Sequence, residues 1–507
     1  MNGLETFVTE YLALNAGAYY IRQFIVILCL FVYGSVLCDH FMSRNESWIK
    51  RGILAFPVGI SAFAITAYVM LTAGIRYNAL TVCIAVALEL AVLIIADRKS
   101  YAAISLHDVR GHMLITTAAA AAVAAFATSG LAGVAISNDT MYYFRRYPDA
   151  IVYYGGLRDS FDFFLTDTGL GSVSIDTLPA LFAFGETFGI REFFHISFLS
   201  FFAVTVYERS KKYISGRSCI ISSAIITAVL AVSTPFVILG HWALANMYFM
   251  ELFFIVAYRL IDTDPEKTGA EMLMLIGLGL LRIEGTMFVV WLMVCVAIFT
   301  DIGKKLTVYA ALPLTVLFSA YCVKIYTQYQ LFDNIYHFLT PFKAVLLVAV
   351  MVCAGIFMAI IQPRLPEKIK RILPALSVVA LVCANLVLLM YNRELYIGNL
   401  SAFAANWFRQ SGWGLLPHIV IAMTALLAIE YGINAASGKG VAGKDNAFNI
   451  VLLAGFVLIV IAASFGRGDV LAEAVGDSGN RVMLQAVPLV VMTYGELFLG
   501  LLRDNKR

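Results

Sequence analysis

Long apolar runs separated by short polar segments recur from near residue 22 to residue 502. A helix that spans a bilayer needs about 20 predominantly apolar residues. The pattern therefore predicts an all-α fold, a polytopic transmembrane helical bundle with about 13–15 membrane helices. The candidate spans are 22–43, 52–75, 79–97, 113–136, 190–208, 219–240, 242–261, 271–281, 285–300, 307–323, 342–362, 372–391, 415–431, 448–465 and 482–502.

The run 271–300 is too long for one span, about 45 Å as a continuous helix, and short for two. Arg282, Glu284 and Gly285 lie at its middle. We expect a broken hairpin of two short helices that turns at "RIEG". The alternative is a single tilted helix with an Arg–Glu pair inside the membrane, which would itself point to function.

Composition supports the membrane interpretation, because 61% of the 507 residues are hydrophobic and only 14% are charged. Soluble domains are about half apolar and about a quarter charged. The net charge of +3, without a Lys/Arg block, gives no indication of nucleic acid. The eight cysteines are scattered without metal-ligand spacing, so we expect no disulfide framework, no metal site and no cofactor. A divalent metal is not indicated, although the chemistry considered below would permit one.

Basic loops set the expected orientation, because such loops stay on the cytoplasmic side. They fall on one side if the N-terminus is outside and the C-terminus is cytoplasmic. The stretch 262–270 falls on this inner side too, although it is acidic. We expect an integral protein of a bacterial inner (plasma) membrane. The basic loops are 43–51, 97–112, 208–217, 301–305, 363–371, 438–444 and 503–507.

The outer loop 137–189 is the longest and holds acids, arginines and tyrosines together. We expect short interfacial helices in it, broken at Gly155–Gly156. Asp139 directly ends an apolar run, which would place a carboxylate at membrane depth. The candidate catalytic residues of this loop are Asp139, Asp159, Asp162 and Glu186, and the candidate substrate-binding residues are Arg145 and Arg146.

Later outer segments add further candidates for substrate binding. Simpler explanations exist: His241 is compatible with an ordinary satisfied polar residue, and Arg481 with a side chain that snorkels to the headgroups. The candidates are His241, Arg282, Glu284, Lys324 and Arg481.

Carboxylates beside arginines at a lipid–water boundary suit a lipid substrate that carries a phosphate. The guanidinium fork binds phosphate with two parallel hydrogen bonds and keeps its charge when desolvated. A carboxylate can take the proton of an attacking hydroxyl. These residue types therefore favour transfer of a sugar away from a lipid phosphate.

Four segments carry a family resemblance. Residues 176–212 hold Leu178–Pro179, Phe188–Gly189, Arg191 and a basic helix end; "GLGLLRIEG" (277–285), "KIYTQYQLFDN" (324–334) and "GNRVMLQAVPL" (479–489) follow. In this order they resemble the motifs of GT-C superfamily glycosyltransferases, over roughly residues 113–502.

The resemblance implies an enzyme that takes a sugar from a polyprenyl-phosphate carrier and inverts the anomeric carbon. It implies Asp139 as the base and Arg282, Lys324 and Arg481 as the phosphate-binding residues. It also implies two regions: a three-helix membrane extension at 1–112 and a GT-C-like catalytic core at 113–507.

The chain departs from the family at two places. Three extra helices (22–97) precede the core, and the outer turn near His241 lacks an acid, which makes a metal site doubtful. Asp159, Asp162 or Glu186 would then supply a second carboxylate.

Partners and alternatives follow from the same face. The acceptor could be lipopolysaccharide, another cell-envelope glycan, a lipid or a protein, and membrane lipid surrounds the chain. Residues 22–97 could recruit a membrane partner. The alternative functions are a transporter or flippase, and a polymerase or ligase of undecaprenyl-linked glycans.

Overall fold

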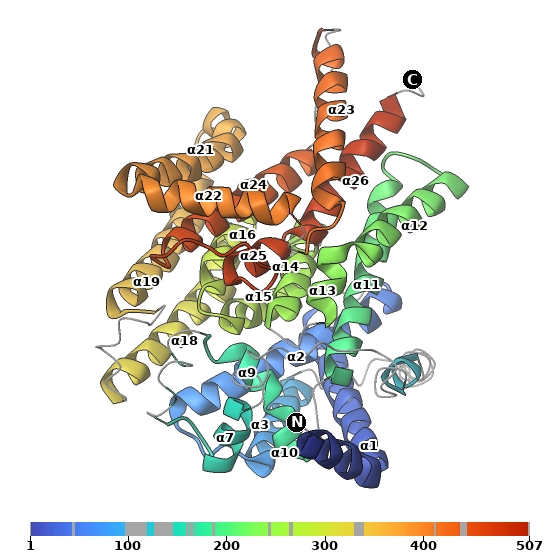
Figure 1. Ribbon diagram of the computed structural model, residues 1–507, viewed down its shortest axis with the longest axis vertical. Helices are drawn as coiled ribbons and strands as arrows, with labels where there is room; N and C mark the ends of the chain where they lie inside the picture. The colour runs from blue at the N-terminus through green and yellow to red at the C-terminus, as the bar shows by residue number, and fades with distance from the viewer. Residues whose placement is uncertain are drawn as a thin grey trace.

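The computed structural model describes the chain as helices joined by short connections (Figure 1). It contains no β-strand within the residues that it describes, and this agrees with the expected all-α class. Those residues are 2–42, 46–96, 119–125, 146–158, 161, 165, 168–184, 188–241, 245–262, 267–328, 339–409, 412–436 and 444–504.

The first half of the chain forms the lower and central parts of the view in Figure 1 and reaches its upper right in α12. Its helices are α1 (Asn2–Phe41), α2 (Trp48–Ala73), α3 (Ala79–Ala96), α7 (Tyr147–Tyr154), α9 (Gly171–Asp176), α10 (Leu178–Phe182), α11 (Phe188–Ser210), α12 (Arg217–Val232), α13 (Thr234–His241), α14 (Ala245–Asp262), α15 (Gly269–Leu281) and α16 (Gly285–Phe299).

The second half continues with helices interrupted by three π-helical turns. Its elements are α17 (Gly303–Leu306), η3 (Thr307–Ala311), α18 (Leu312–Val323), η4 (Lys324–Gln328), α19 (Pro341–Ile356), η5 (Phe357–Ile361), α20 (Gln362–Arg364), α21 (Glu367–Tyr391), α22 (Arg393–Phe408), α23 (Leu416–Ala436), α24 (Lys444–Phe465), α25 (Ser478–Leu484) and α26 (Val487–Asp504).

Nine helical stretches in the described part are long and apolar enough to cross a membrane. The count becomes ten if α12 and α13, which meet at a bend of 61°, form one broken span. Three shorter apolar helices lie at 269–281, 285–299 and 416–429. The chain is therefore a polytopic helical membrane protein, while the count of 13–15 membrane helices stays a prediction.

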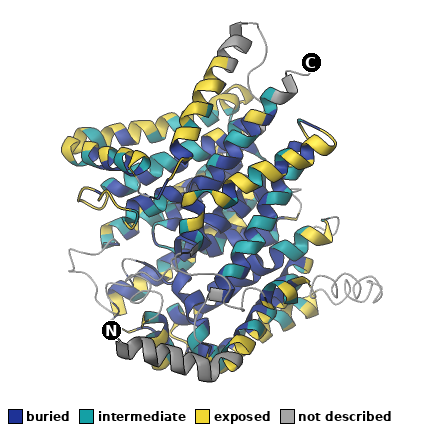
Figure 2. Cartoon of the chain, turned by 45° about the vertical axis from the view of Figure 1, so that its right-hand side comes forward, coloured by how far each residue is buried: buried dark blue, intermediate teal, exposed yellow. Residues whose placement is uncertain are grey.

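Burial separates the central helices from those at the periphery. In the most apolar window of α2, 83% of the residues are buried, whereas α3 and α21 have 6% each. Figure 2 shows buried residues through the middle of the molecule and exposed residues along the outer helices. The exposed residues of α21 include Leu376, Val379 and Leu386, which suit contact with lipid tails.

Residues 269–299 form the expected broken hairpin. Arg259 near the end of α14 bonds Glu271 near the start of α15, and Asn246 at the start of α14 bonds Arg282 just after α15. Helices α14 and α15 are therefore antiparallel. Helix α16 runs parallel to α14, because Phe288 packs on Phe249 and because Phe299 and Tyr258 both pack on Phe448.

The outer loop contributes one partly exposed helix, α7, and one fully buried helix, α9. Helix α7 ends at Gly155, which has a φ of 70°, as expected for a short helix stopped by the Gly155–Gly156 pair. Helix α9, by contrast, is buried along all six residues and packs against α2, α14 and α15. A Cβ atom on Gly171 would lie 2.1 Å from the Leu280 carbonyl oxygen, so only glycine permits this approach.

Candidate functional site

Arg282 stands at the break between α15 and α16, in an extended backbone conformation. Its Nη2 forms an ion pair with Glu284, and its Nη1 donates a 2.7 Å hydrogen bond to Asn246 Oδ1. The Arg282 Nε and the Asn246 Nδ2 are buried and donate to no acceptor in the described part of the chain. Two neighbouring donor residues therefore each have a hydrogen bond left to give.

A narrow recess, which has no room for a water molecule, lies on one side of Arg282 and reaches helix α25. Asp477 caps this helix by accepting hydrogen bonds from the backbone of Gly479 and Asn480, which fixes its start. Arg481, in the middle of α25, is half-buried and is followed by the recess residue Val482. The recess, called here the Arg282 recess, is lined by Phe249, Arg282, Glu284, Gly285, Phe288, Val482 and Gln485.

On its other side Arg282 lines a small cavity that reaches the outer loop. Gly169, with a φ of 84°, packs directly on Ile283 and Arg282. The cavity has room for about one water molecule, and Tyr321 of α18 is among the residues that line it. The outer loop, the α15–α16 break and α25 therefore meet around Arg282.

Lys324 lies one helical turn beyond Tyr321, at the start of η4. Its Nζ donates 2.9 Å hydrogen bonds to the carbonyl oxygens of Leu71 and Thr72, at the end of α2. A cation at this position satisfies carbonyls that a helix end leaves unpaired. Two of the three donors of this ammonium group thus serve the fold in this structure.

Of the remaining predicted site residues, the structure describes the side chain of Arg146 alone. Arg146 is exposed at the start of α7. His241 ends α13, but its side chain lies outside the described residues, as do Asp139, Arg145, Asp159, Asp162 and Glu186. The proposed base and second carboxylate therefore stay predictions.

Three polar residues near this site had no role in the sequence interpretation: Asn246, His195 and Glu251. Glu251 is a single acid in the apolar run 242–261, which is the one sequence signal that could have indicated it. His195 and Glu251 form an ion pair between α11 and α14. A second buried pair, Asp176 with Arg191 at 2.9 Å, was visible in the sequence only as two charges near a motif.

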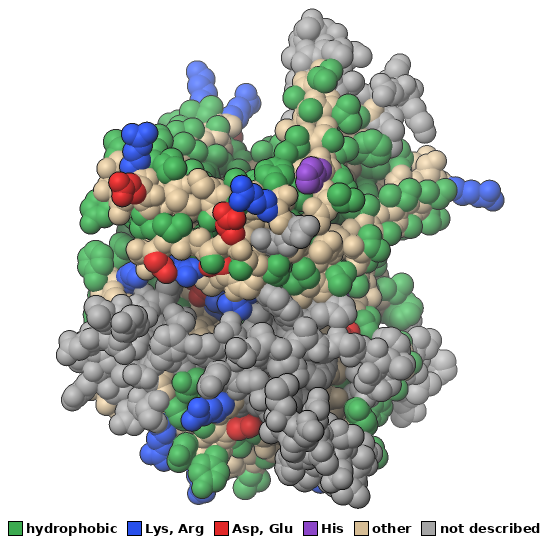
Figure 3. All heavy atoms as spheres, viewed as in Figure 1, with side chains coloured by type: hydrophobic (Ala, Val, Ile, Leu, Met, Phe, Trp, Pro, Cys, Tyr) green, Lys and Arg blue, Asp and Glu red, His purple; other side chains and the backbone are tan. Residues whose placement is uncertain are grey.

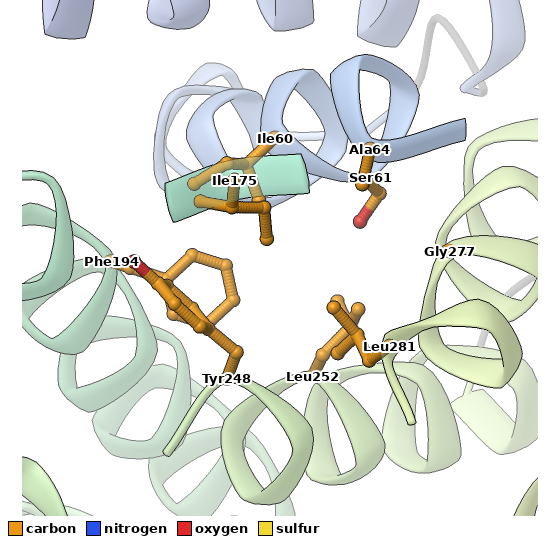
Figure 4. A pocket seen from close by; sticks show the side chains of 9 residues that line it. All are labelled: Ile60, Ser61, Ala64, Ile175, Phe194, Tyr248, Leu252, Gly277 and Leu281. Atoms are coloured by element: carbon orange, nitrogen blue, oxygen red, sulfur yellow. The ribbon is translucent and has the colours of Figure 1, made fainter. Parts of the chain in front are cut away.

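Below α9 the bundle holds a second small cavity, again with room for about one water molecule (Figure 4). Side chains from α2, α9, α11, α14 and α15 point toward it, mostly apolar ones such as Ile60, Ile175 and Leu252. The Ser61 hydroxyl donates to the Pro57 carbonyl oxygen. The cavity is thus a packing gap between five elements and too small for a substrate.

The opposite ends of α11, α14 and α15 carry two arginine networks. Arg209 donates to Asp262 at 2.8 and 3.0 Å and to Glu496 at 2.9 Å. Its guanidinium also lies over the Tyr258 ring, 4.6 Å from the centroid. Four elements are held together there, because Glu496 belongs to α26 and accepts a further hydrogen bond from Asn449 of α24.

In the second network Arg259 donates to Glu271 at 2.9 Å and to Glu46 at 3.0 and 3.2 Å. Glu46 lies in the connection between α1 and α2 and also pairs with Lys50 at 3.4 Å. Burial acts to raise the pKa of the Glu46 carboxyl, but the hydrogen bonds and charges of Arg259 and Lys50 outweigh it, so that the pKa is lowered.

Figure 3 shows many hydrophobic side chains on the coloured surface above the grey region, and several acidic and basic side chains at the edge of that region. Arg467 pairs with Asp477 at 3.3 Å. Arg409, directly after α22, pairs at 3.2 Å with Glu473, which lies in the segment before α25. Among the described residues no group of three or more His, Cys, Asp or Glu side chains is arranged to hold a metal ion.

Comparison with protein-family models, with curated proteins and with solved structures found no match to this chain.

Proposed function

We propose that the protein is a membrane glycosyltransferase that moves a sugar from a polyprenyl-phosphate donor to a cell-envelope glycan, a lipid or a protein. The reaction takes place on the non-cytoplasmic face of a bacterial inner membrane, with the N-terminus outside. The GT-C-like arrangement suggested by the sequence motifs belongs to this proposal, as does the division at residue 112.

The observation that carries the proposal is the unsaturated guanidinium of Arg282. It lies at a broken hairpin, and its partner Asn246 also retains a free N–H. Part-buried donors of this kind bind a phosphate oxygen more strongly than the same donors in water. Arg481, on the helix that borders the Arg282 recess, adds a second positive charge to this region.

In the proposed reaction the acceptor hydroxyl attacks the anomeric carbon from the side opposite the phosphate, which inverts that carbon. The new C–O bond forms as the bond between the anomeric carbon and the phosphate oxygen breaks, and the electron pair leaves with the phosphate. Asp139 takes the hydroxyl proton. Arg282 and Arg481 stabilise the charge that grows on the departing phosphate.

A transporter or flippase is the second candidate, and the broken helices favour it. Transporters place ionisable residues at interrupted helices inside the membrane. The 61° bend between α12 and α13 and the charged break at Arg282 are features of this kind.

One assay separates the two. Purified protein in vesicles is given a polyprenyl-phosphate donor with a radiolabelled sugar, together with a cell-envelope glycan, lipid or protein acceptor. Both glycoside formation and movement of the donor lipid across the bilayer are measured. We expect glycoside formation, lost in Asp139→Asn and retained in Asp149→Asn, a control on the exposed first turn of α7. Lipid movement without a glycoside product would favour the flippase instead.

A further inference from the structure

His195 of α11 and Glu251 of α14 form an ion pair inside the bundle, between His195 Nδ1 and Glu251 Oε1. The His195 side chain is 17% exposed and the Glu251 side chain is fully buried. The second carboxylate oxygen of Glu251, Oε2, is buried and accepts no hydrogen bond from any described residue. The pair is thus an ionisable site that the surrounding protein leaves incompletely satisfied.

Packing alone does not account for this pair. Helices α11 and α14 already join through an aromatic cluster in which Phe198 and Phe202 contact Phe254. Buried ion pairs can often be replaced by apolar residues without loss of stability. An ionisable group within a membrane helix is by default a candidate for function.

Titratable and charged groups near the pair come from α9, α11 and α14. On α9, Asp176 pairs with Arg191 and interacts electrostatically with Tyr248. On α11, Glu192 interacts electrostatically with both His195 and Glu251. On α14, Tyr248 lies one turn before Glu251 and carries the Arg191 guanidinium over its ring. Among the described side chains of α13, the imidazole meets the Phe236 ring and Gly240.

Helix α13 rests directly on the imidazole. The His195 ring stacks on Phe236, with centroids 4.6 Å apart and planes 24° apart. A Cβ atom on Gly240 would lie 2.8 Å from His195 Cε1, so the α13 backbone touches the ring edge. The far end of α13 is His241, a predicted substrate residue, and α13 also contacts α25, which carries Arg481.

We propose that His195 and Glu251 bind one exchangeable proton, and that the occupancy of this proton site sets the position of α13. The proton can reside on the imidazole, as an ion pair, or leave the pair as a neutral ring beside a bare carboxylate. Losing it leaves a buried carboxylate without a charge partner, which favours rearrangement of the ring that supports α13.

If α13 moves, His241 and the contact of α13 with α25 move with it, and an effect of that movement on substrate binding rests on the proposed function. The proton site and its effect on α13 do not rest on it. The experiment therefore measures α13 itself, by backbone hydrogen exchange of a peptide covering 234–241. It uses the full chain in lipid nanodiscs without substrate, from about pH 5 to about pH 9. Rates are corrected for the intrinsic pH dependence of exchange.

In the wild-type protein we expect the protection of α13 from hydrogen exchange to fall by about tenfold from the acidic to the basic end of this range. Glu251→Gln should abolish the change. The apolar pair His195→Phe with Glu251→Leu should also give pH-independent protection, and it guards against misfolding of the single variant. His418→Asn, on exposed helix α23, is the matched control and should behave as wild type.

Constant protection of α13 across the pH range in the wild-type protein would overturn the proposal. So would an unchanged pH response in a folded apolar-pair variant. Absence of sugar transfer in the vesicle assay would instead count against the proposed function and leave this result standing.

Discussion

Helices α11, α14 and α15 carry buried or part-buried arginines at both of their ends, and the two ends differ in how fully these arginines are hydrogen-bonded. At one end Arg209 and Arg259 are each bound by two carboxylates. At the other end Arg282 has one carboxylate and one amide, and its Nε remains without an acceptor in the described part of the chain. This bundle can therefore surround a buried arginine with enough carboxylates to accept its hydrogen bonds. The unsaturated Arg282 is therefore informative about ligand binding.

The largest effect on stability is expected at the saturated end. Arg209→Met removes the shared partner of Asp262 and Glu496, and an uncompensated buried carboxylate costs about 3–5 kcal/mol. The free energy of unfolding, or the apparent melting temperature in detergent, should fall accordingly. The control is Arg409→Met, whose exposed pair contributes at most about 1 kcal/mol. Equal melting temperatures for these two variants would contradict the assignment of Arg209 as structural.

At the unsaturated end the effect should appear in activity. Arg282→Met should lower sugar transfer about 10²–10³-fold, as the loss of one donor to a developing charge does in other enzymes. Its melting temperature should fall less than that of Arg209→Met, because Glu284 is part-exposed and can be hydrated. Arg282→Lys tests the fork geometry, since a point charge restores the charge and loses the second parallel bond. Full activity in Arg282→Met would remove this residue from the site.

The smallest effect concerns the pH dependence of the saturated end. Because the pKa of Glu46 is lowered in the folded protein from its ordinary value of 4.5, its stabilising contribution is complete above that pH. It is lost as the pH falls through the folded-state pKa. Glu46→Gln should therefore be less stable than wild type at neutral pH, and the difference should shrink in acid. Melting temperatures along an acid series test this, and a difference that grows in acid would contradict it.

The sequence predicted the large features of the fold because they depend on apolar length. The 271–300 run was too long for one span, and Arg282 and Gly285 marked its break, which the structure confirms. The all-helical class followed from the same pattern. The number of membrane helices and the side of the membrane remain predictions, because neither depends on contacts between the described residues.

Partners across the bundle could not be foreseen. Asn246 is an ordinary polar residue in sequence, and only the antiparallel packing of α14 on α15 brings it to Arg282. Lys324 was expected at a phosphate, yet its amine binds two carbonyls at the end of α2, a tertiary contact without a sequence signal. The burial of α9 arises from the close approach of Gly171 to Leu280 and not from any apolar run.

The deep position of α2 has a consequence for how the protein is made. Helix α2 ends at Ala73, but its partner α15 begins at Gly269, so the 195 residues from 74 to 268 are synthesised between them. At roughly 5–20 residues per second, a ribosome needs about 10–40 s for that interval. At the start of this interval α1 is the neighbour available to cover α2, against which Gly34 and Gly59 bring the two backbones into direct contact. The first two helices must therefore persist in the lipid as a pair until α9, α11 and then α15 are synthesised and pack against α2.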